Sequence, residues 1–390
     1  MFTGSAIDGL LEQGCASGAV PGVVAFVVGR DGILYEGAAG RLSVGGEAPA
    51  GTDTVIRIAS MTKAMTTVAA LQLVEQGRLD LDGTVASLLP AFGELQVLTG
   101  FDGDTPMLRR PARQATVREL MNHTAGNAYW FLHEGMRRYH EVTGTPDVLT
   151  GMRAALSAPL VDDPGARWEY GINTDWLGQV IEAVSGLPLD AYFAENIFAP
   201  LGLTDTTFVP SDAQRRRMMA AHARTPDGGL VEIPLELPTA PEIWSGGHGV
   251  HCTAGDYARF LGALLGDGAP LLRPESVDLM FTDSLGGLPL PAVIRSAVPE
   301  LTNDIPSLPV RAGWGLGLHL FLEDLPGMRA AGSGDWAGLL NCYYWIDRAG
   351  GVAGGVLTQV LPFFDAQVVQ LAVGVEQAVY AQLRMPAAAV

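Results

Sequence analysis

Cysteine is scarce in this chain: three residues in 390, with none of the spacing that pairs thiols. Cys15, Cys252 and Cys342 form no C-x-x-C motif, and their number is odd. This usage predicts free thiols in a reducing compartment, and therefore a cytoplasmic protein. Cys252 follows His248 and His251, but no fourth ligand is near in the sequence, so a loop with incidental polar residues is favoured over a metal site. We expect neither a metal nor an organic cofactor.

Positive charge and long apolar runs are also scarce. The chain has 24 Lys and Arg against 42 Asp and Glu, a formal net charge of −18, which argues against nucleic acid or an anionic membrane surface as a partner. No apolar run approaches the length of a membrane span. The apolar stretch at residues 20–28 is interrupted by Pro21 and Gly22. Since Asp31 and Gly32 follow it, we interpret it as a strand entering a hairpin, not as a signal peptide.

What the chain does contain is enough apolar sequence for a large core. Hydrophobic residues make up 48% and charged residues 17%, as in a globular protein. Hydrophobic periodicity predicts helices at 5–16, 61–76, 117–121, 176–184, 189–198, 254–265 and 368–383, and strands at 23–28, 33–36, 316–321, 339–346 and 352–361. Residues 93–113 and 210–242 are predicted to be loop or connection.

Strands at both ends with helices between them predict an α/β fold of the α+β type. We expect residues 1–84 and 243–390 to form one discontinuous sheet domain. Residues 85–242 would form an inserted, mainly helical domain, with the active site at the interface.

The sequence Ser60-Met61-Thr62-Lys63 is an S-x-x-K motif at the start of the predicted helix 61–76. Residues three apart are neighbours on one helix face, so a serine nucleophile and a lysine base could meet there. Alone, this spacing more often means a capping serine and a solvated lysine. The apolar flanks change the interpretation, because they predict a buried helix, and a buried lysine is costly unless it has a partner or a role.

Four motifs in order resemble those of the family VIII carboxylesterases, relatives of class C β-lactamases and D-alanyl-D-alanine carboxypeptidases. They are Ile58-Ala59-Ser60-Met61-Thr62-Lys63, Leu120-Met121-Asn122-His123-Thr124-Ala125-Gly126, Trp168-Glu169-Tyr170-Gly171-Ile172-Asn173 and Gly334-Asp335-Trp336-Ala337-Gly338. The resemblance extends from about residue 20 to about residue 380. It implies a serine β-lactamase-like fold, with an antiparallel sheet flanked by helices.

The resemblance also implies catalytic roles. Ser60 would be the nucleophile, and Lys63 with Tyr170 would handle its proton. The backbone N–H groups of Ser60 and Leu339 would form the oxyanion hole, with Leu339 following the W-x-G motif on an edge strand of the sheet. We interpret His123 as structural. No G-x-S-x-G motif occurs, which argues against an α/β-hydrolase.

Two departures from β-lactamases favour ester substrates. Ile172 stands where class C enzymes carry an asparagine, which here comes one residue later as Asn173. Trp336 stands where β-lactamases present a lysine to the substrate carboxylate, so a charge-assisted contact is missing. The residues expected to bind substrate are Tyr129, Ile172, Asn173, Trp336 and Gly338, with Trp130, Phe131 and Trp244 as further candidates for an apolar wall. For Tyr129, a simple wall is as plausible as a hydrogen-bonding role.

We therefore expect a serine carboxylesterase that hydrolyses short-chain esters through an acyl-enzyme on Ser60, with weak β-lactamase activity as a possible side reaction. Alternatives within the same fold are an acyltransferase, an amide or peptide hydrolase, or a β-lactamase. A non-catalytic scaffold is the alternative from another class. The expected partner is a small-molecule ester, and the sequence leaves the oligomeric state open.

Overall fold

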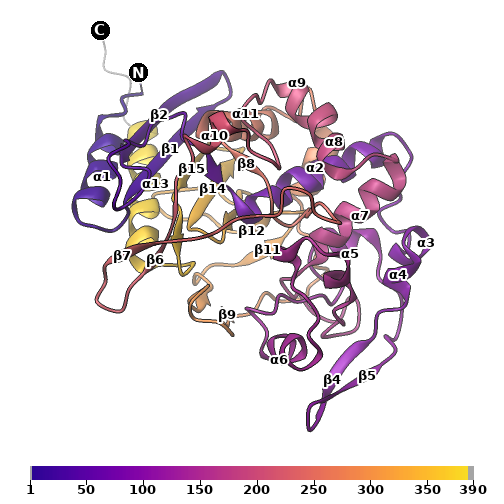
Figure 1. The fold of residues 1–390 in the computed structure, drawn as a ribbon. Helices are drawn as coiled ribbons and strands as arrows, with labels where there is room; N and C mark the ends of the chain where they lie inside the picture. The colour runs from indigo at the N-terminus through magenta and orange to yellow at the C-terminus, as the bar shows by residue number, and fades with distance from the viewer. Residues whose placement is uncertain (1, 385–390) are drawn as a thin grey trace.

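The computed structural model describes residues 2–384 and is built around a seven-stranded antiparallel sheet. Both ends of the chain contribute to it, as expected (Figure 1). The strand order is β11 (Ala312–Trp314), β12 (His319–Phe321), β13 (Gly334–Gly338), β14 (Cys342–Asp347), β15 (Val352–Leu357), β1 (Gly22–Gly29) and β2 (Gly32–Gly40). The predicted mixed fold with an antiparallel sheet is confirmed.

Helices cover both faces of this sheet, which explains why β1 is buried along its whole length. Val23, Ala25 and Val27 pack on one face with α1 (Ser5–Ala16) and α13 (Ala366–Arg384). Val24 and Phe26 point the other way, toward α11 (Ala254–Leu265) and the main core. The two-residue period of a strand thus divides its side chains between two apolar layers.

The central helix α2 (Thr62–Glu75) is buried on every side, because its residues from Thr62 to Leu73 are all buried. It packs against α7 (Asn173–Ser185) and begins after the 3₁₀ turn η1 (Ala59–Met61). The predicted helix at 61–76 is therefore confirmed to within one residue. Ser60 lies inside the preceding 3₁₀ turn and does not cap the helix.

The region between residues 85 and 242 carries most of the remaining helices. They are α3 (Val85–Leu88), α4 (Pro90–Gly93), α5 (Val117–Met121), α6 (Glu134–Thr143), η2 (Val148–Thr150), η3 (Arg153–Ser157), α7, α8 (Leu189–Phe193), η4 (Ala194–Phe198), α9 (Ala199–Leu201) and α10 (Asp212–Arg215). After it come α11 and α12 (Pro274–Met280). The proposed division into domains stays a prediction.

Two segments predicted to be loop contain strands, and those predictions were wrong. The first holds the hairpin of β4 (Val97–Asp102) and β5 (Thr105–Arg109). The second holds β6 (Ala221–Arg224) and β7 (Leu230–Ile233), which join β16 (Val360–Leu361) in a small sheet. The predicted strand 352–361 is accordingly split between β15 and β16. Two further two-stranded sheets pair β3 (Ile56–Arg57) with β8 (His251–Cys252), and β9 (Val293–Ile294) with β10 (Ile305–Pro306).

The strand that carries the W-x-G motif, β13, is not an edge strand. It pairs with β12 on one side and β14 on the other, so the edges of the sheet are β11 and β2. The strand predicted at 316–321 is observed as the shorter β12. The strand predicted at 339–346 is observed as β14, which begins only at Cys342. Within residues 2–384, no helix combines the length and the apolar character needed to cross a membrane.

Candidate active site

Ser60 lines a cavity of about 320 Å³ together with Tyr129, Tyr170 and Trp336. The remaining lining is mostly apolar and comes from the helical region, from the end of β13 and from the loops around β9 and β10. It includes Phe131, Leu132, Leu149, Trp168, Leu290, Leu301, Ile305, Trp314, Leu339 and Phe363. A hydroxyl nucleophile at the wall of an apolar cavity is the arrangement that an acyl-binding pocket requires.

Lys63 is directed at the nucleophile by three hydrogen bonds. Its Nζ donates to Ser60 Oγ at 3.1 Å, to the hydroxyl of Tyr129 at 2.9 Å and to the backbone oxygen of Gly247 at 2.8 Å. The side chain is 1% exposed. These three acceptors match the three protons of an ammonium group.

Tyr170 lies beside this lysine, but its hydroxyl is bonded elsewhere. The Nζ of Lys63 is 4.8 Å from the centroid of the Tyr170 ring, and Trp336 Nε1 donates to the Tyr170 hydroxyl at 2.9 Å. The tyrosine hydroxyl that accepts from Lys63 is that of Tyr129. The structure thus brings Ser60, Lys63, Tyr170 and Trp336 together and adds Tyr129 as a direct partner of the lysine.

The backbone before the nucleophile is strained. Ala59 has a φ of 46°, a left-handed conformation that residues with a Cβ seldom adopt. Next to it, the Ile58 N–H donates to Val250 O at 3.1 Å, so the entry to the turn is tied to the strand region of β8. Strain of this kind persists only where the surroundings impose it, and it often marks functional sites.

The end of β13 packs closely on this turn. A Cβ built on Gly338 would lie 2.3 Å from Ile58 O, so only glycine lets the two backbones approach this far. In the part of the chain that the structure describes, the N–H of Leu339 has no hydrogen-bond acceptor. A free N–H beside Ser60 is what the oxyanion hole needs, and the assignment of Ser60 and Leu339 to that role stays a prediction.

Four of the residues expected to bind substrate lie outside the cavity lining, namely Trp130, Ile172, Asn173 and Trp244. Trp130 packs behind Phe131, with ring centroids 6.0 Å apart, and Trp244 packs on Phe208 at 5.4 Å. Asn173 donates through Nδ2 to Nδ1 of His123 at 2.9 Å. Both side chains are buried, and burial together with the charge of Lys63 lowers the pKa of His123, as suits a structural histidine.

Other residues at the cavity had no signal in the sequence. Arg57, three residues before the nucleophile, lines the cavity, donates to Met219 O and is 8% exposed. Among residues 2–384 no carboxylate lies within ion-pair distance of it. His319 also lines the cavity, with Nδ1 2.7 Å from Asp335 Oδ1. Burial lowers the pKa of another lining residue, His248.

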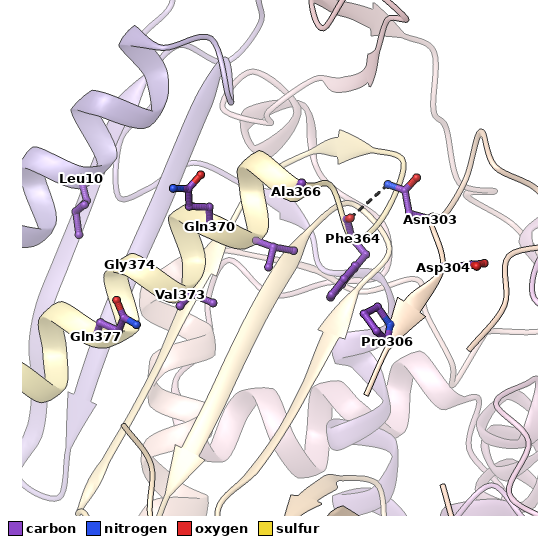
Figure 2. Close-up of a pocket in the computed structure, with 11 residues that line it drawn as sticks. Leu10, Asn303, Asp304, Pro306, Phe364, Ala366, Gln370, Val373, Gly374 and Gln377 are labelled. Atoms are coloured by element: carbon purple, nitrogen blue, oxygen red, sulfur yellow. Dashed lines mark hydrogen bonds between the residues drawn. The ribbon is translucent and has the colours of Figure 1, made fainter. Parts of the chain in front are cut away.

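A second hollow lies on the outer side of α13 and has no catalytic group. Figure 2 shows its lining of Leu10, Gln370, Val373 and Gln377, opposite the loop that carries Asn303. It contains no serine, lysine or histidine. Two of its residues, Pro306 and Phe364, also line the Ser60 cavity, so one wall separates the two spaces.

Comparison with known proteins shows which proteins this chain resembles. The sequence pattern of the Beta-lactamase family matches residues 7–374. Monacolin J acid methylbutanoyltransferase of Aspergillus terreus is 37% identical over 345 residues, covering 86% of this chain and 84% of that protein. Lovastatin esterase of Penicillium rubens is 32% identical over 375 residues, covering 91% and 93%. Among solved structures, a mutant of simvastatin synthase from Aspergillus terreus superimposes with a TM-score of 0.85 at 33% identity, covering 97% of each chain.

Proposed function

The chain belongs to the Beta-lactamase family, and from this premise we propose that Ser60, Lys63 and Tyr170 are its catalytic residues. The chain is an enzyme of the serine hydrolase and acyltransferase kind. The finer assignment rests on one observation: Ser60 and Tyr170 line the same apolar cavity, while Lys63 donates a hydrogen bond to Ser60 Oγ.

In this proposal Ser60 Oγ attacks the carbonyl carbon of an ester. Its proton passes to the Lys63–Tyr170 pair, which holds one proton fewer than an ammonium group with a phenol, and from there to the leaving alkoxide, so that an alcohol departs and an acyl-Ser60 remains. The N–H groups of Ser60 and Leu339 hold the oxyanion of the tetrahedral intermediate. Trp336 Nε1 donates to the Tyr170 oxygen, and a donor at that atom stabilises negative charge while the proton is away. Water then attacks the acyl-enzyme and gives a proton to the Lys63–Tyr170 pair, which returns it to Ser60 Oγ as the acid leaves.

We infer that the substrate is a carboxylic ester with a short acyl group. The bulky rings of Phe131, Trp168 and Trp336 line the same cavity as Ser60, and we expect them to leave little room for a long acyl chain. The leucine and isoleucine side chains that also line the cavity suit an apolar alcohol part. The names of the relatives agree with this reading, since one is a methylbutanoyltransferase and another a lovastatin esterase.

Acyl transfer to an alcohol is the second candidate. It shares every step up to the acyl-enzyme and differs only in the acceptor. The apolar lining favours entry of an apolar alcohol over water, and a transferase stands among the relatives at 37% identity. Amide, peptide and β-lactam hydrolysis are less favoured, because Trp336 offers no cation where β-lactamases present a lysine to an anionic substrate.

A labelling and turnover experiment tests the proposal. A fluorophosphonate should label the pure protein at Ser60, and Ser60→Ala should abolish both the labelling and the turnover of p-nitrophenyl butyrate. A p-nitrophenyl ester series from acetyl to octanoyl, with a chromogenic cephalosporin beside it, should peak at the short esters. Added butanol should divert part of the acyl group to butyl ester if transfer competes. Absence of labelling at Ser60 would exclude the catalytic assignment and revive a non-catalytic scaffold.

A further inference from the structure

A buried carboxylate, Asp175, is connected to the catalytic lysine through Tyr129 and Gly247. It takes no part in the proposed reaction steps. It belongs to the first turn of α7 and is fully buried. It does not line the Ser60 cavity. Within residues 2–384 no lysine or arginine lies within ion-pair distance of it, and the nearest basic group is Nδ1 of His248 at 3.7 Å. A buried anion of this kind is costly unless hydrogen bonds hold it.

Three hydrogen bonds hold the carboxylate of Asp175. Oδ1 accepts from the hydroxyl of Ser245 and from the N–H of Gly247, the latter at 3.0 Å. Oδ2 accepts from the hydroxyl of Tyr129 at 3.4 Å. Ser245 in turn contacts His248, with Oγ 2.9 Å from Nδ1. Because Ser245 donates straight to the carboxylate, the order is aspartate–serine–histidine, and this cluster is not a second nucleophilic triad.

The same carboxylate therefore holds two of the three groups that bind Lys63. Tyr129 and Gly247 each bond to Asp175 on one side and accept from Lys63 Nζ on the other. The third acceptor is Ser60 Oγ. A Tyr129 hydroxyl that donates its only proton to Asp175 must turn its lone pairs toward the lysine.

The close packing at Gly247 supports this arrangement independently. A Cβ built there would lie 2.5 Å from Asp175 Oδ2 and 2.8 Å from the Tyr129 hydroxyl. Glycine is thus the residue that allows its backbone to lie between the carboxylate and the lysine. The segment 245–248 thus donates hydrogen bonds to the carboxylate of Asp175 and accepts one from Lys63 Nζ.

We propose that Asp175 is a positioning residue that directs Lys63 Nζ at Ser60 Oγ by fixing Tyr129 and Gly247. It also supplies, two hydrogen bonds away through Tyr129 or Gly247, a negative charge that balances the buried ammonium group. The proposal rests on the proposed function, in which Lys63 and Ser60 act together. A purely structural role is the alternative, since an acidic residue in the first turn stabilises a helix.

The test is Asp175→Asn, which keeps the shape of the side chain and removes its charge. For p-nitrophenyl butyrate we expect kcat to fall about 10- to 100-fold, the effect of a small misplacement of a catalytic group. KM should change less than about 3-fold, because Asp175 does not touch the cavity. The rate of labelling by the fluorophosphonate should fall with kcat.

The matched control is Asp256→Asn, a second buried aspartate, in the first turn of α11, which accepts hydrogen bonds from the Asp205 N–H, the Thr206 hydroxyl and the Arg259 guanidinium. It should lower the melting temperature and leave kcat unchanged. If Asp175→Asn behaves in the same way, the positioning role is overturned. Failure of the wild-type protein to label at Ser60 would instead contradict the proposed function.

Tyr129→Phe is a second variant that tests the same proposal if Asp175→Asn does not fold. This variant keeps the ring and breaks the same hydrogen-bonded chain, so kcat should again fall while KM changes little. Where both variants fold, the double variant should lose much less than the product of the two single losses, because both interrupt one chain. An unchanged kcat in Tyr129→Phe, or losses that multiply, would overturn the proposal.

Discussion

The hydrogen bond from Trp336 to Tyr170 agrees with the proposal that Trp336 takes the position of the lysine of β-lactamases. The residue keeps a donor, the indole N–H, directed at the tyrosine oxygen at 2.9 Å. It gives up a full positive charge that would attract an anionic substrate. One side chain can thus support the chemistry of Tyr170 and at the same time favour neutral esters.

Replacing Trp336 by phenylalanine removes the N–H donor but keeps an aromatic ring in the cavity wall. It should therefore slow the reaction. We expect kcat for p-nitrophenyl butyrate to fall about 10- to 100-fold, because a hydrogen bond to a charged group contributes roughly 1.5–3 kcal/mol. The control is Trp314→Phe, since Trp314 also lines the cavity but its Nε1 has no partner in the described chain. Equal effects of the two variants would show that volume, and not the donor, matters at Trp336.

Lys63 and Tyr170 should behave as one proton-handling unit. Lys63→Ala and Tyr170→Phe should each cost nearly as much kcat as the double variant, because residues that act together are non-additive. Steady-state kinetics of the two single variants and the double variant check this. If the losses multiply, the two residues act independently and the shared-proton mechanism is wrong.

The motif residues of the site could be predicted from the sequence, but their partners could not. Ser60 and Lys63 are three apart on one helix, so their contact follows from local geometry. The bond from Lys63 to Tyr129 joins residues 66 positions apart, and the support from Asp175 comes from a third segment. Such contacts depend on how α2 and α7 pack, which no local pattern encodes. The assignment to family VIII and the cytoplasmic location stay predictions.

Among the elements, β13 shows why strands were harder to predict than helices here. Its sequence, Gly334-Asp335-Trp336-Ala337-Gly338, contains two glycines and an aspartate, which are all poor strand formers. It is a strand because β12 and β14 pair with it on both sides. Long periodic helices such as α1 and α11 needed no such support, and their predicted bounds agree with the structure.

The junction of β13 with the turn η1 should tolerate no side chain at Gly338. Gly338→Ala would bring a Cβ to 2.3 Å from Ile58 O, and the resulting shift should destabilise the protein by about 1–3 kcal/mol. It should also lower kcat, because a shift of β13 would move the N–H of Leu339, which follows this strand, away from Ser60. Urea unfolding and ester kinetics measure the two effects.

The control for this prediction is Gly9→Ala in α1, where an added Cβ meets nothing within 4 Å. That change should stabilise the protein by about 0.5–1 kcal/mol, since alanine is the better helix former. Activity should be unaffected. If Gly338→Ala kept wild-type stability and kcat, the close contact between β13 and Ile58 would not exist in solution.

At the scale of the whole molecule, buried histidines should couple stability to pH. His123, His222, His248 and His251 are all buried, and burial lowers the pKa of each, that of His251 to about 4. The folded protein keeps them neutral at pH values where the unfolded chain would protonate them. The unfolded state then binds more protons, so the free energy of unfolding falls as the pH drops below about 6.5.

Four carboxyl groups oppose this trend, because burial raises the pKa of Glu169, Glu182, Asp256 and Glu376. Burial raises the pKa of Glu169, next to Tyr170, to about 7. The folded state therefore retains a proton that the unfolded state releases above its ordinary pKa near 4.5, which adds stability on acidification between pH 7 and 4.5.

The protein should therefore be clearly less stable at pH 5.5 than at pH 7.5. Each proton taken up on unfolding changes the free energy of unfolding by about 1.4 kcal/mol per pH unit, so His251, whose pKa is lowered to about 4, should by itself cost about 1.4 kcal/mol over this range. The measurement is the urea midpoint at the two pH values for the wild type and for His251→Gln, which removes one of the four protonation sites. The variant should lose less stability on acidification than the wild type. Equal midpoints at both pH values would mean that these histidines are not held neutral by the fold, and that the packing around His123 and His248 beside the active site is looser than the structure shows.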